Sequence, residues 1–332
     1  MSIVLITPST MENQPDRPYV KMLEEAGFEV RYPTNPELVT GLCSDEETVS
    51  ALDGISAIIA GGEHFNANVL SSLPEMRVIA RAGVGFDRVD VPAATERSIA
   101  VTITPTANHE AVAEQALTLL LAVAKGIVWR DAAVRRGEWP KEPLKPVRRR
   151  TLGIVGLGRI GRSMALRAAG VGMNVIATEV YPDLEFVRAH NIELVDLDSL
   201  LARSDYVTLH CPLNEETFHL FDRKAFAKMK RGAVLINTAR GPLVVESDLH
   251  DALESGQLGA AGLDVFEQEP PDPQNPLFEL SNVVLSPHAA GGDDDSVESM
   301  ATESAENIIQ LYRGQWPEGA VVNDELKSRW KW

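Results

Sequence analysis

The sequence predicts an α/β protein of two domains, each built around a mostly parallel sheet. Three observations lead to this prediction. The chain has 332 residues, which is long for a single hydrophobic core. Short apolar runs alternate with amphipathic stretches along it, as expected for parallel strands joined by helices. A loop rich in Pro, Lys and Arg at residues 137–150 separates a first series of these units from a second.

The first series occupies about the first hundred residues. A helix is expected over residues 19–26, where Gly27 would end it, and a longer helix over 110–125, which Asn108 can cap. Short apolar runs bounded by Gly or Pro predict strands at residues 3–6, 28–32, 55–60, 77–81 and 99–103.

The second series has the same alternation and a cleaner pattern. Its strands are expected at residues 151–155, 174–178, 206–209, 233–237, 259–264 and 282–285. Its helices are expected at residues 160–169, 184–190, 224–227 and 246–255. A last helix over 294–313 should return to the first domain, because the first series has no natural end of its own. We therefore expect a discontinuous first domain with the second domain inserted into it.

Charge and cysteine content narrow the classes of function. Asp and Glu number 48 against 31 Lys and Arg, a net charge of −17. Such a surface repels phosphate backbones, so no nucleic-acid partner is expected. The two cysteines lie far apart, which argues against both a disulfide framework and a metal site. No basic leader with a long apolar run and no stretch of eighteen apolar residues is present, so we expect no membrane partner and a cytoplasmic location.

The first turn of the second series reads Gly-Leu-Gly-Arg-Ile-Gly and matches the pattern G-x-G-x-x-G. It follows a predicted strand and opens a predicted helix, which is the context of a dinucleotide-binding turn. Gly156 would allow the tight turn, Gly158 the close approach of a pyrophosphate, and Gly161 the packing of helix on strand. Free N–H groups at Arg159 and Ile160 would face the phosphates. The alternative is a glycine-rich turn without a ligand.

A carboxylate at the end of the next strand indicates which dinucleotide binds. Glu179 stands eighteen residues after Gly161. At this position a carboxylate can accept hydrogen bonds from the adenosine ribose and repel a 2′-phosphate. The prediction is therefore NAD rather than NADP, with an incidental strand-end Glu as the alternative.

A guanidinium, a carboxylate and an imidazole follow later strands of the second series. Arg240, Glu269 and His288 each come shortly after a predicted strand. Because ligands bind at the carboxyl ends of parallel strands, all three should face the edge that carries the glycine-rich turn. Singly, such an Arg is more often a surface ion pair and such a His more often structural or exposed. Their occurrence together, downstream of a dinucleotide turn, favours one shared site.

The chemistry of these three side chains fits the reduction of a 2-oxo acid. Arg240 can clamp a carboxylate and polarise the neighbouring carbonyl oxygen. His288 can donate a proton to the forming alkoxide and take it back in the reverse direction. Glu269, behind the imidazole, can hold its orientation and stabilise its charged form. The nicotinamide carries the hydride.

With these residues in place, the chain is similar to the D-isomer-specific 2-hydroxyacid dehydrogenase family. The resemblance spans about residues 50–315 and is carried by the glycine-rich turn, by the sequence His-Cys-Pro-Leu at 210–213, and by the segments around Arg240, Glu269 and His288. It implies that these last three residues are the catalytic ones. It also implies cofactor contacts at Cys211, Pro212, Thr217, Thr238, Ala239, Asp264 and His288.

The resemblance further implies two Rossmann-like domains. A flavodoxin-like substrate-binding domain would comprise residues 1–102 and 286–332, and an NAD-binding Rossmann domain, residues 103–285, would be inserted into it. Members of the family are typically homodimers through the nucleotide domain, so a homodimer is implied as well.

The substrate carboxylate is expected on the loop after the strand at 77–81. The resemblance places it on the backbone N–H groups of Gly83 and Val84, with Arg81 and Arg240 as cationic contacts. A tight strand-exit turn without a ligand is the alternative.

The chain departs from the family pattern near this loop. Phosphoglycerate dehydrogenases of the family often carry an Arg in the loop after the strand at 55–60, where this chain has two glycines and Glu63. The substrate therefore stays open among 3-phosphoglycerate, hydroxypyruvate and glyoxylate. Gln115 stands where many members carry His. A non-catalytic, NAD-sensing protein of the corepressor kind is the main alternative function, and formate or phosphite oxidation on the same scaffold is another.

Overall fold

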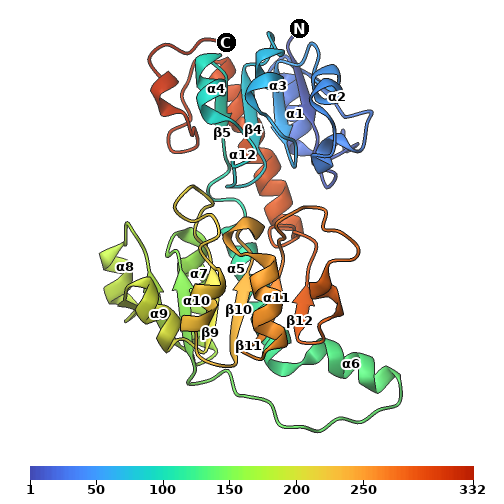
Figure 1. The fold of residues 1–332 in the computed structure, drawn as a ribbon. Coiled ribbons are helices and arrows are strands. Elements are labelled where there is room, and N and C mark those ends of the chain that lie inside the picture. The colour runs from blue at the N-terminus through green and yellow to red at the C-terminus, as the bar shows by residue number, and fades with distance from the viewer. The chain divides into compact units, whose positions relative to one another are not determined.

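The fold is described from a computed structural model in which all of residues 1–332 are placed (Figure 1). The chain divides into two units. The first comprises residues 1–108 and 292–332, and the second is the continuous segment 109–291. The second unit is therefore inserted into the first in sequence.

The first unit is built on a five-stranded, fully parallel sheet. Its strands are β1 (Ile3–Ile6), β2 (Glu29–Arg31), β3 (Ala57–Ala60), β4 (Val78–Arg81) and β5 (Ala100–Thr102). They lie in the order β2-β1-β3-β4-β5, which is the flavodoxin-like order. The carboxyl ends of β3 and β4 are therefore adjacent, and the loops that leave them are neighbours.

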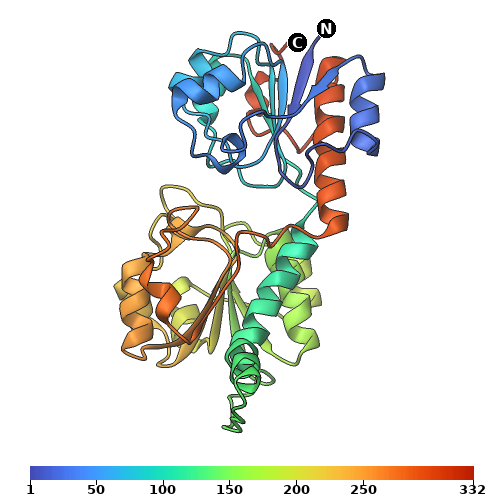
Figure 2. The ribbon, with the colours of Figure 1, turned by 90° about the vertical axis from the view of Figure 1, so that its right-hand side faces the viewer.

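Helices cover both faces of this sheet. They are α1 (Pro18–Glu25), α2 (Asp45–Ala51), α3 (Ala67–Ser71), α4 (Val91–Glu96) and α12 (Asp294–Tyr312). The last helix lies beside α1 (Figure 2). Its residues Met300, Ala301, Ala305 and Ile308 are buried in the same apolar cluster as Val4 of β1. The expected return of the C-terminal helix to the first domain is confirmed.

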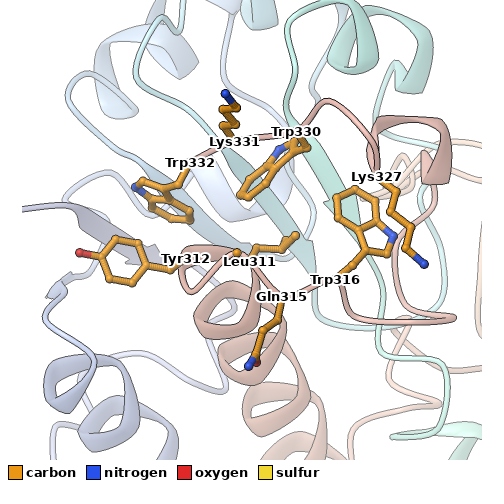
Figure 3. A pocket seen from close by; sticks show the side chains of 9 residues that line it. Leu311, Tyr312, Gln315, Trp316, Lys327, Trp330, Lys331 and Trp332 are labelled. Carbon is orange, nitrogen blue, oxygen red and sulfur yellow. The ribbon is translucent and has the colours of Figure 1, made fainter.

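An aromatic cluster closes the C-terminal part of this unit. Trp332 stacks edge-on against Tyr312 at 5.0 Å and against Trp330 at 6.2 Å between ring centroids. Figure 3 shows these rings around a small pocket of about 240 Å³. The Nε1 atom of Trp332 donates to the hydroxyl of Ser2, so the cluster ties the segment after α12 to β1.

The second unit is built on a seven-stranded, fully parallel sheet. Its strands are β6 (Thr151–Val155), β7 (Asn174–Thr178), β8 (Glu193–Leu194), β9 (Tyr206–Leu209), β10 (Ala233–Asn237), β11 (Leu258–Leu263) and β12 (Val283–Leu285). Their order is β12-β11-β10-β9-β6-β7-β8, so the order reverses between β6 and β9. In such doubly wound sheets ligands bind at this reversal, outside the carboxyl ends of the strands.

Helices of the second unit pack on both faces of its sheet, except for Ile127–Arg135, which projects from the unit (Figure 1). They are α5 (His109–Lys125), α6 (Ile127–Arg135), α7 (Arg159–Gly170), α8 (Leu184–Ala189), α9 (Leu197–Arg203), α10 (Arg223–Lys228) and α11 (Glu246–Glu254). The core helix is α5, with Ala113, Ala116 and Leu120 fully buried. No single helix is long and apolar enough to cross a membrane; α5 and α6 pass that test only as a pair, bent by 56°, and only by length and composition.

The helix α6 and the loop after it stand out from the rest of the second unit in both views (Figures 1 and 2). Large apolar side chains on this projection are exposed. Ile127 is 56% exposed, Val128 55%, Val134 49%, Trp139 73% and Leu144 39%. This concentration of apolar surface on one element is unusual for a face that stays in water.

The predicted class, two doubly wound α/β units with parallel sheets, is confirmed by these topologies. The predicted strands are all present, with ends that differ by one or two residues. The structure adds helices that the sequence reading left out, namely α2, α3, α4, α6 and α9.

The division between the units differs in detail from the expected boundaries. Residues 103–108, expected in the nucleotide domain, belong to the first unit, where Ile103 N–H donates to a carbonyl of the C-terminal segment. Residues 286–291, expected in the substrate domain, belong to the second unit, where His288 N–H donates to the Asp264 carbonyl at 2.7 Å. Each of these two segments therefore forms a hydrogen bond within the unit to which it belongs.

Candidate active site

The glycine-rich turn joins β6 to α7 and has two glycines that packing requires. Gly156 has φ of +94°, and a Cβ there would lie 2.6 Å from the backbone nitrogen of Cys211. A Cβ on Gly161 would lie 2.1 Å from the carbonyl oxygen of Gly156. Both distances are impossible for a side chain, so these two positions accept only glycine. They hold α7 tightly against β6 and β9.

The middle glycine of the turn is different. Gly158 has φ of −69° and ψ of −159°, which any residue can adopt, and a Cβ there would meet no atom of the chain within 4 Å. Gly158 is also exposed and caps the start of α7. Nothing inside the protein requires glycine at this position. A ligand that packed against the turn would require glycine there. Because the first turn of α7 has free N–H groups, an anion is the kind of ligand that would fit.

Glu179 lies beside this turn. It follows β7, and its Oε2 accepts a hydrogen bond from the Leu157 N–H at 2.6 Å, while Oε1 accepts one from the Tyr181 N–H at 3.0 Å. The carboxylate is thus held next to the turn by two backbone donors. This is where a ribose contact would be needed if a pyrophosphate lay on the first turn of α7.

Other residues expected at the cofactor follow β9 and β10. Burial raises the pKa of Cys211 to about 11, so its thiol stays protonated. Thr217 caps its own loop, with its hydroxyl donating to the Pro212 carbonyl at 2.7 Å. The Thr238 hydroxyl is buried and has no hydrogen-bond partner in the chain. A buried hydroxyl without a partner is costly unless a ligand satisfies it, so Thr238 fits a wall of the dinucleotide site.

Glu269 and His288 form a close pair at the carboxyl edge of the same sheet. The Nδ1 atom of His288 lies 2.7 Å from Oε2 of Glu269. The other oxygen of Glu269 accepts a hydrogen bond from the Phe266 N–H at 3.1 Å, which fixes the carboxylate. The ring nitrogen Nε2 is left to face a substrate, since Nδ1 is engaged. His288 is 48% exposed at its side chain, so its ring is accessible.

Asp264 holds the loop that carries this imidazole. Its side chain is fully buried at the end of β11, and its two carboxylate oxygens accept hydrogen bonds from the N–H groups of Ala289 and Ala290, each at 3.0 Å. Its own carbonyl accepts from the His288 N–H. His288 itself has φ of +52°, a left-handed conformation that is uncommon for residues other than glycine. The hydrogen bonds to Asp264 help to hold this conformation.

Arg240 follows β10 and is brought against the loop of Glu269. A Cβ on Gly241 would lie 1.8 Å from the Phe266 carbonyl oxygen, so the backbone after Arg240 touches the backbone that leads to Glu269. The side chain of Asn237 braces the turn, donating to the Arg240 carbonyl at 2.8 Å and accepting from the Ala239 N–H at 3.0 Å. The three strand-end residues therefore belong to one packed edge.

Two residues that support this edge were missed from the sequence. Asn237 is almost fully buried at the end of a buried strand. A polar residue at the end of an apolar run is the feature of the sequence that could have indicated its role. Gln115 on α5 donates from Nε2 to the Ser286 hydroxyl at 3.0 Å, two residues before His288. Gln115 was noted only as a departure from the family, and the partner 171 residues away could not be identified from spacing.

The loop expected to hold the substrate carboxylate belongs to the first unit and follows β4. The Gly83 N–H already donates to the Thr104 hydroxyl at 2.9 Å, whereas the N–H groups of Val84 and Gly85 donate no hydrogen bond within the chain. Val84 and Gly85 are therefore the readier donors for an anion, and Gly83 serves the turn. Arg81 lies at the base of the loop, where its Nε donates to the Gly85 carbonyl at 3.2 Å.

Comparison with known proteins shows the family to which the chain belongs. Residues 117–290 match the family model described as D-isomer specific 2-hydroxyacid dehydrogenase, NAD binding domain. A glyoxylate reductase from Korarchaeum cryptofilum is 41% identical over 290 residues, which are 85% of this chain and 86% of that protein. A D-3-phosphoglycerate dehydrogenase from Methanocaldococcus jannaschii is 39% identical over 305 residues, 91% of this chain but 57% of that protein.

A solved structure extends the likeness to the whole chain. The structure of D-lactate dehydrogenase from Aquifex aeolicus, complexed with NAD and lactic acid, matches with a TM-score of 0.84 at 27% identity, over 96% of this chain and 98% of that one. The chain therefore belongs to the D-isomer specific 2-hydroxyacid dehydrogenase family and is an NAD-dependent oxidoreductase of that family.

Proposed function

We propose that the protein interconverts a D-2-hydroxy acid and its 2-oxo acid, with Arg240, Glu269 and His288 as the catalytic residues. The observation that carries the proposal is the 2.7 Å contact between His288 and Glu269, at the edge of the sheet that also carries the glycine-rich turn. Bound NAD supplies the hydride acceptor or donor.

Each of the three side chains has a defined task. In the direction of reduction, Nε2 of His288 donates a proton to the oxygen that was the carbonyl, and in oxidation it takes this proton back. Glu269 holds Nδ1 so that Nε2 faces the substrate. Arg240 and the N–H groups of the loop 83–85 bind the carboxylate, and Arg240 also polarises the carbonyl oxygen.

The substrate is a small 2-oxo or 2-hydroxy acid. Glyoxylate and the phosphorylated acid of phosphoglycerate dehydrogenases are candidates, since relatives with those names are about 40% identical to the chain. Hydroxypyruvate is a third candidate, which the resemblance to the family implies. Oxidation of NADH, followed with a panel of 2-oxo acids with and without a terminal phosphate, tests the proposal. Failure to reduce any of them would count against it.

Replacing Glu179 by Ser should relax the preference for NAD. The carboxylate that would repel a 2′-phosphate is then gone, so kcat/KM with NADPH should rise by about tenfold or more relative to NADH. Steady-state kinetics with both cofactors measure the change. Glu185→Ser, an exposed acid on α8, is the matched control and should leave the ratio as it is. An unaltered cofactor ratio for Glu179→Ser would show that Glu179 does not contact the ribose.

We also infer that the protein is a homodimer that associates through the second unit. The support is the apolar surface of α6 and the loop after it, where Trp139 is 73% exposed. A second copy of the chain is the occupant that the family resemblance implies.

Trp139→Glu should convert the dimer to a monomer. A charge placed in an apolar interface must be desolvated on association, which costs several kcal/mol. Sedimentation or light scattering should then report a mass near 36.2 kDa instead of twice that value. Leu42→Glu, a similarly exposed apolar residue of the first unit, should keep the dimer. A wild-type chain that is already monomeric would contradict the inference.

A further inference from the structure

A fully buried acid lies in the loop after β3. The Glu63 side chain is 0% exposed, and neither carboxylate oxygen has a hydrogen-bond partner at ordinary distance and angle, although the Thr7 hydroxyl lies close enough to lower the pKa of the acid. Its only ion-pair partner is Arg81, whose Nη1 lies 4.0 Å from Oε2. Burial raises the pKa of the Glu63 carboxyl, and the Arg81 guanidinium opposes that rise. Burying a carboxyl group without a cation beside it is costly, so the nearby Arg81 guanidinium is the main charged group that can stabilise Glu63 here.

The Arg81 guanidinium contacts two groups of the first unit. Its side chain is 11% exposed, with Nε on the Gly85 carbonyl and Nη1 facing Glu63. The guanidinium thus fixes the loop whose N–H groups are proposed to bind the substrate carboxylate. An ionised Glu63 at 4.0 Å offsets the charge of Arg81 and so weakens its attraction for a second anionic group on a substrate.

The surroundings of the loop add negative charge. A pocket of about 480 Å³ is lined in part by residues 87–90, which follow the loop, and its charged lining residues are three carboxylates, Asp45, Asp87 and Asp90, against one guanidinium, Arg88. The Arg88 Nη1 donates to the Gly62 carbonyl. Burial, together with Arg88 and Arg81, lowers the pKa of His64, so this imidazole is neutral near pH 7. A phosphate dianion would meet net negative charge here.

We propose that Glu63 is a specificity-determining residue that acts through Arg81: by neutralising that guanidinium beside the loop 83–85, it restricts the enzyme to 2-oxo acids whose carboxylate is their only anionic group. The proposal rests on the proposed function, because it assigns the same loop to substrate binding. It excludes phosphorylated three-carbon acids from the efficient substrates.

The test compares two acids that differ only in a terminal phosphate, hydroxypyruvate and phosphohydroxypyruvate, with the full-length protein and NADH. The wild type should show the higher kcat/KM with hydroxypyruvate. Glu63→Gln leaves the positive charge of Arg81 unbalanced, so the ratio of the two kcat/KM values should shift toward the phosphorylated acid by about tenfold. The double variant Glu63→Gln with Arg81→Met removes both charges and should return the preference for hydroxypyruvate.

Glu75→Gln is the matched control. Glu75 is exposed and precedes β4, so it lies at the opposite end of that strand from Arg81, and its loss should leave the ratio unchanged. A wild type that prefers phosphohydroxypyruvate would overturn the proposal, even if Glu63→Gln does not fold. So would a Glu63→Gln protein that melts like the wild type and keeps its ratio. Inactivity of the wild type toward both acids and glyoxylate would instead contradict the proposed function itself.

Discussion

His288→Ala should lower kcat/KM for the 2-oxo acid by about two to four orders of magnitude, the usual contribution of a general acid–base group. Glu269 holds Nδ1 of His288 at 2.7 Å, so Nε2 is the ring nitrogen that the proposed mechanism assigns to the proton transfer. The affinity for NADH should change little, because the glycine-rich turn and Glu179 are untouched. Steady-state kinetics and a fluorescence titration with NADH measure the two effects separately.

The control for this variant is His190→Ala. His190 is exposed after α8, lies against the Phe186 ring with 4.4 Å between ring centroids, and takes no part in the proposed chemistry, so turnover should stay at the wild-type level. Wild-type turnover in His288→Ala would remove this residue from the mechanism. An equal loss of NADH affinity and turnover would point instead to a collapse of the loop that Asp264 holds.

Gly158→Ala should weaken NAD binding without weakening the fold. Its backbone angles suit alanine and its Cβ would meet no protein atom, so the free energy of unfolding should change by less than about 1 kcal/mol. The same Cβ would stand where the pyrophosphate approaches the turn. We expect the Kd for NADH to rise about tenfold or more, which corresponds to about 1.4 kcal/mol. Thermal melting of the apoprotein measures the change in stability, and calorimetric titration measures the Kd for NADH.

Gly170→Ala is the control that tests whether the loss of NADH affinity is specific to the position of Gly158. Gly170 lies at the other end of α7, and a Cβ there also meets open space. This variant should melt at the wild-type temperature or slightly above, with unchanged NADH affinity. If Gly158→Ala binds NADH as well as the wild type does, the backbone at this turn does not approach the cofactor.

The strands could be predicted because most are short apolar runs with buried side chains, as the fully buried Ala233–Asn237 shows. The missed helices lacked such a signal. Ile127–Arg135 follows directly on Gly126, which reads as the end of the preceding helix, and its apolar residues face outward. Asp45–Ala51 did carry a signal, since Ser44 and Glu47 form a capping box that is recognisable as S-x-x-E.

The part of the site that local sequence motifs define could be predicted. The glycine-rich turn, Arg240, Glu269 and His288 each follow a strand, and parallel topology alone brings strand ends to one edge. Contacts between distant segments were not predictable. The pairing of the Gly83 N–H with Thr104, and that of Glu63 with Arg81, depend on the register of β3, β4 and β5, which no sequence spacing reveals.

The insertion of one unit into the other has a consequence for synthesis on the ribosome. The first unit buries Met300, Ala301 and Ile308 of α12 in its core, so its first 108 residues emerge without a helix they need. The second unit is continuous and has all its strands and helices once residue 291 has been made. We therefore expect the inserted unit to fold first, while the N-terminal segment waits with an exposed apolar face that a chaperone would have to protect.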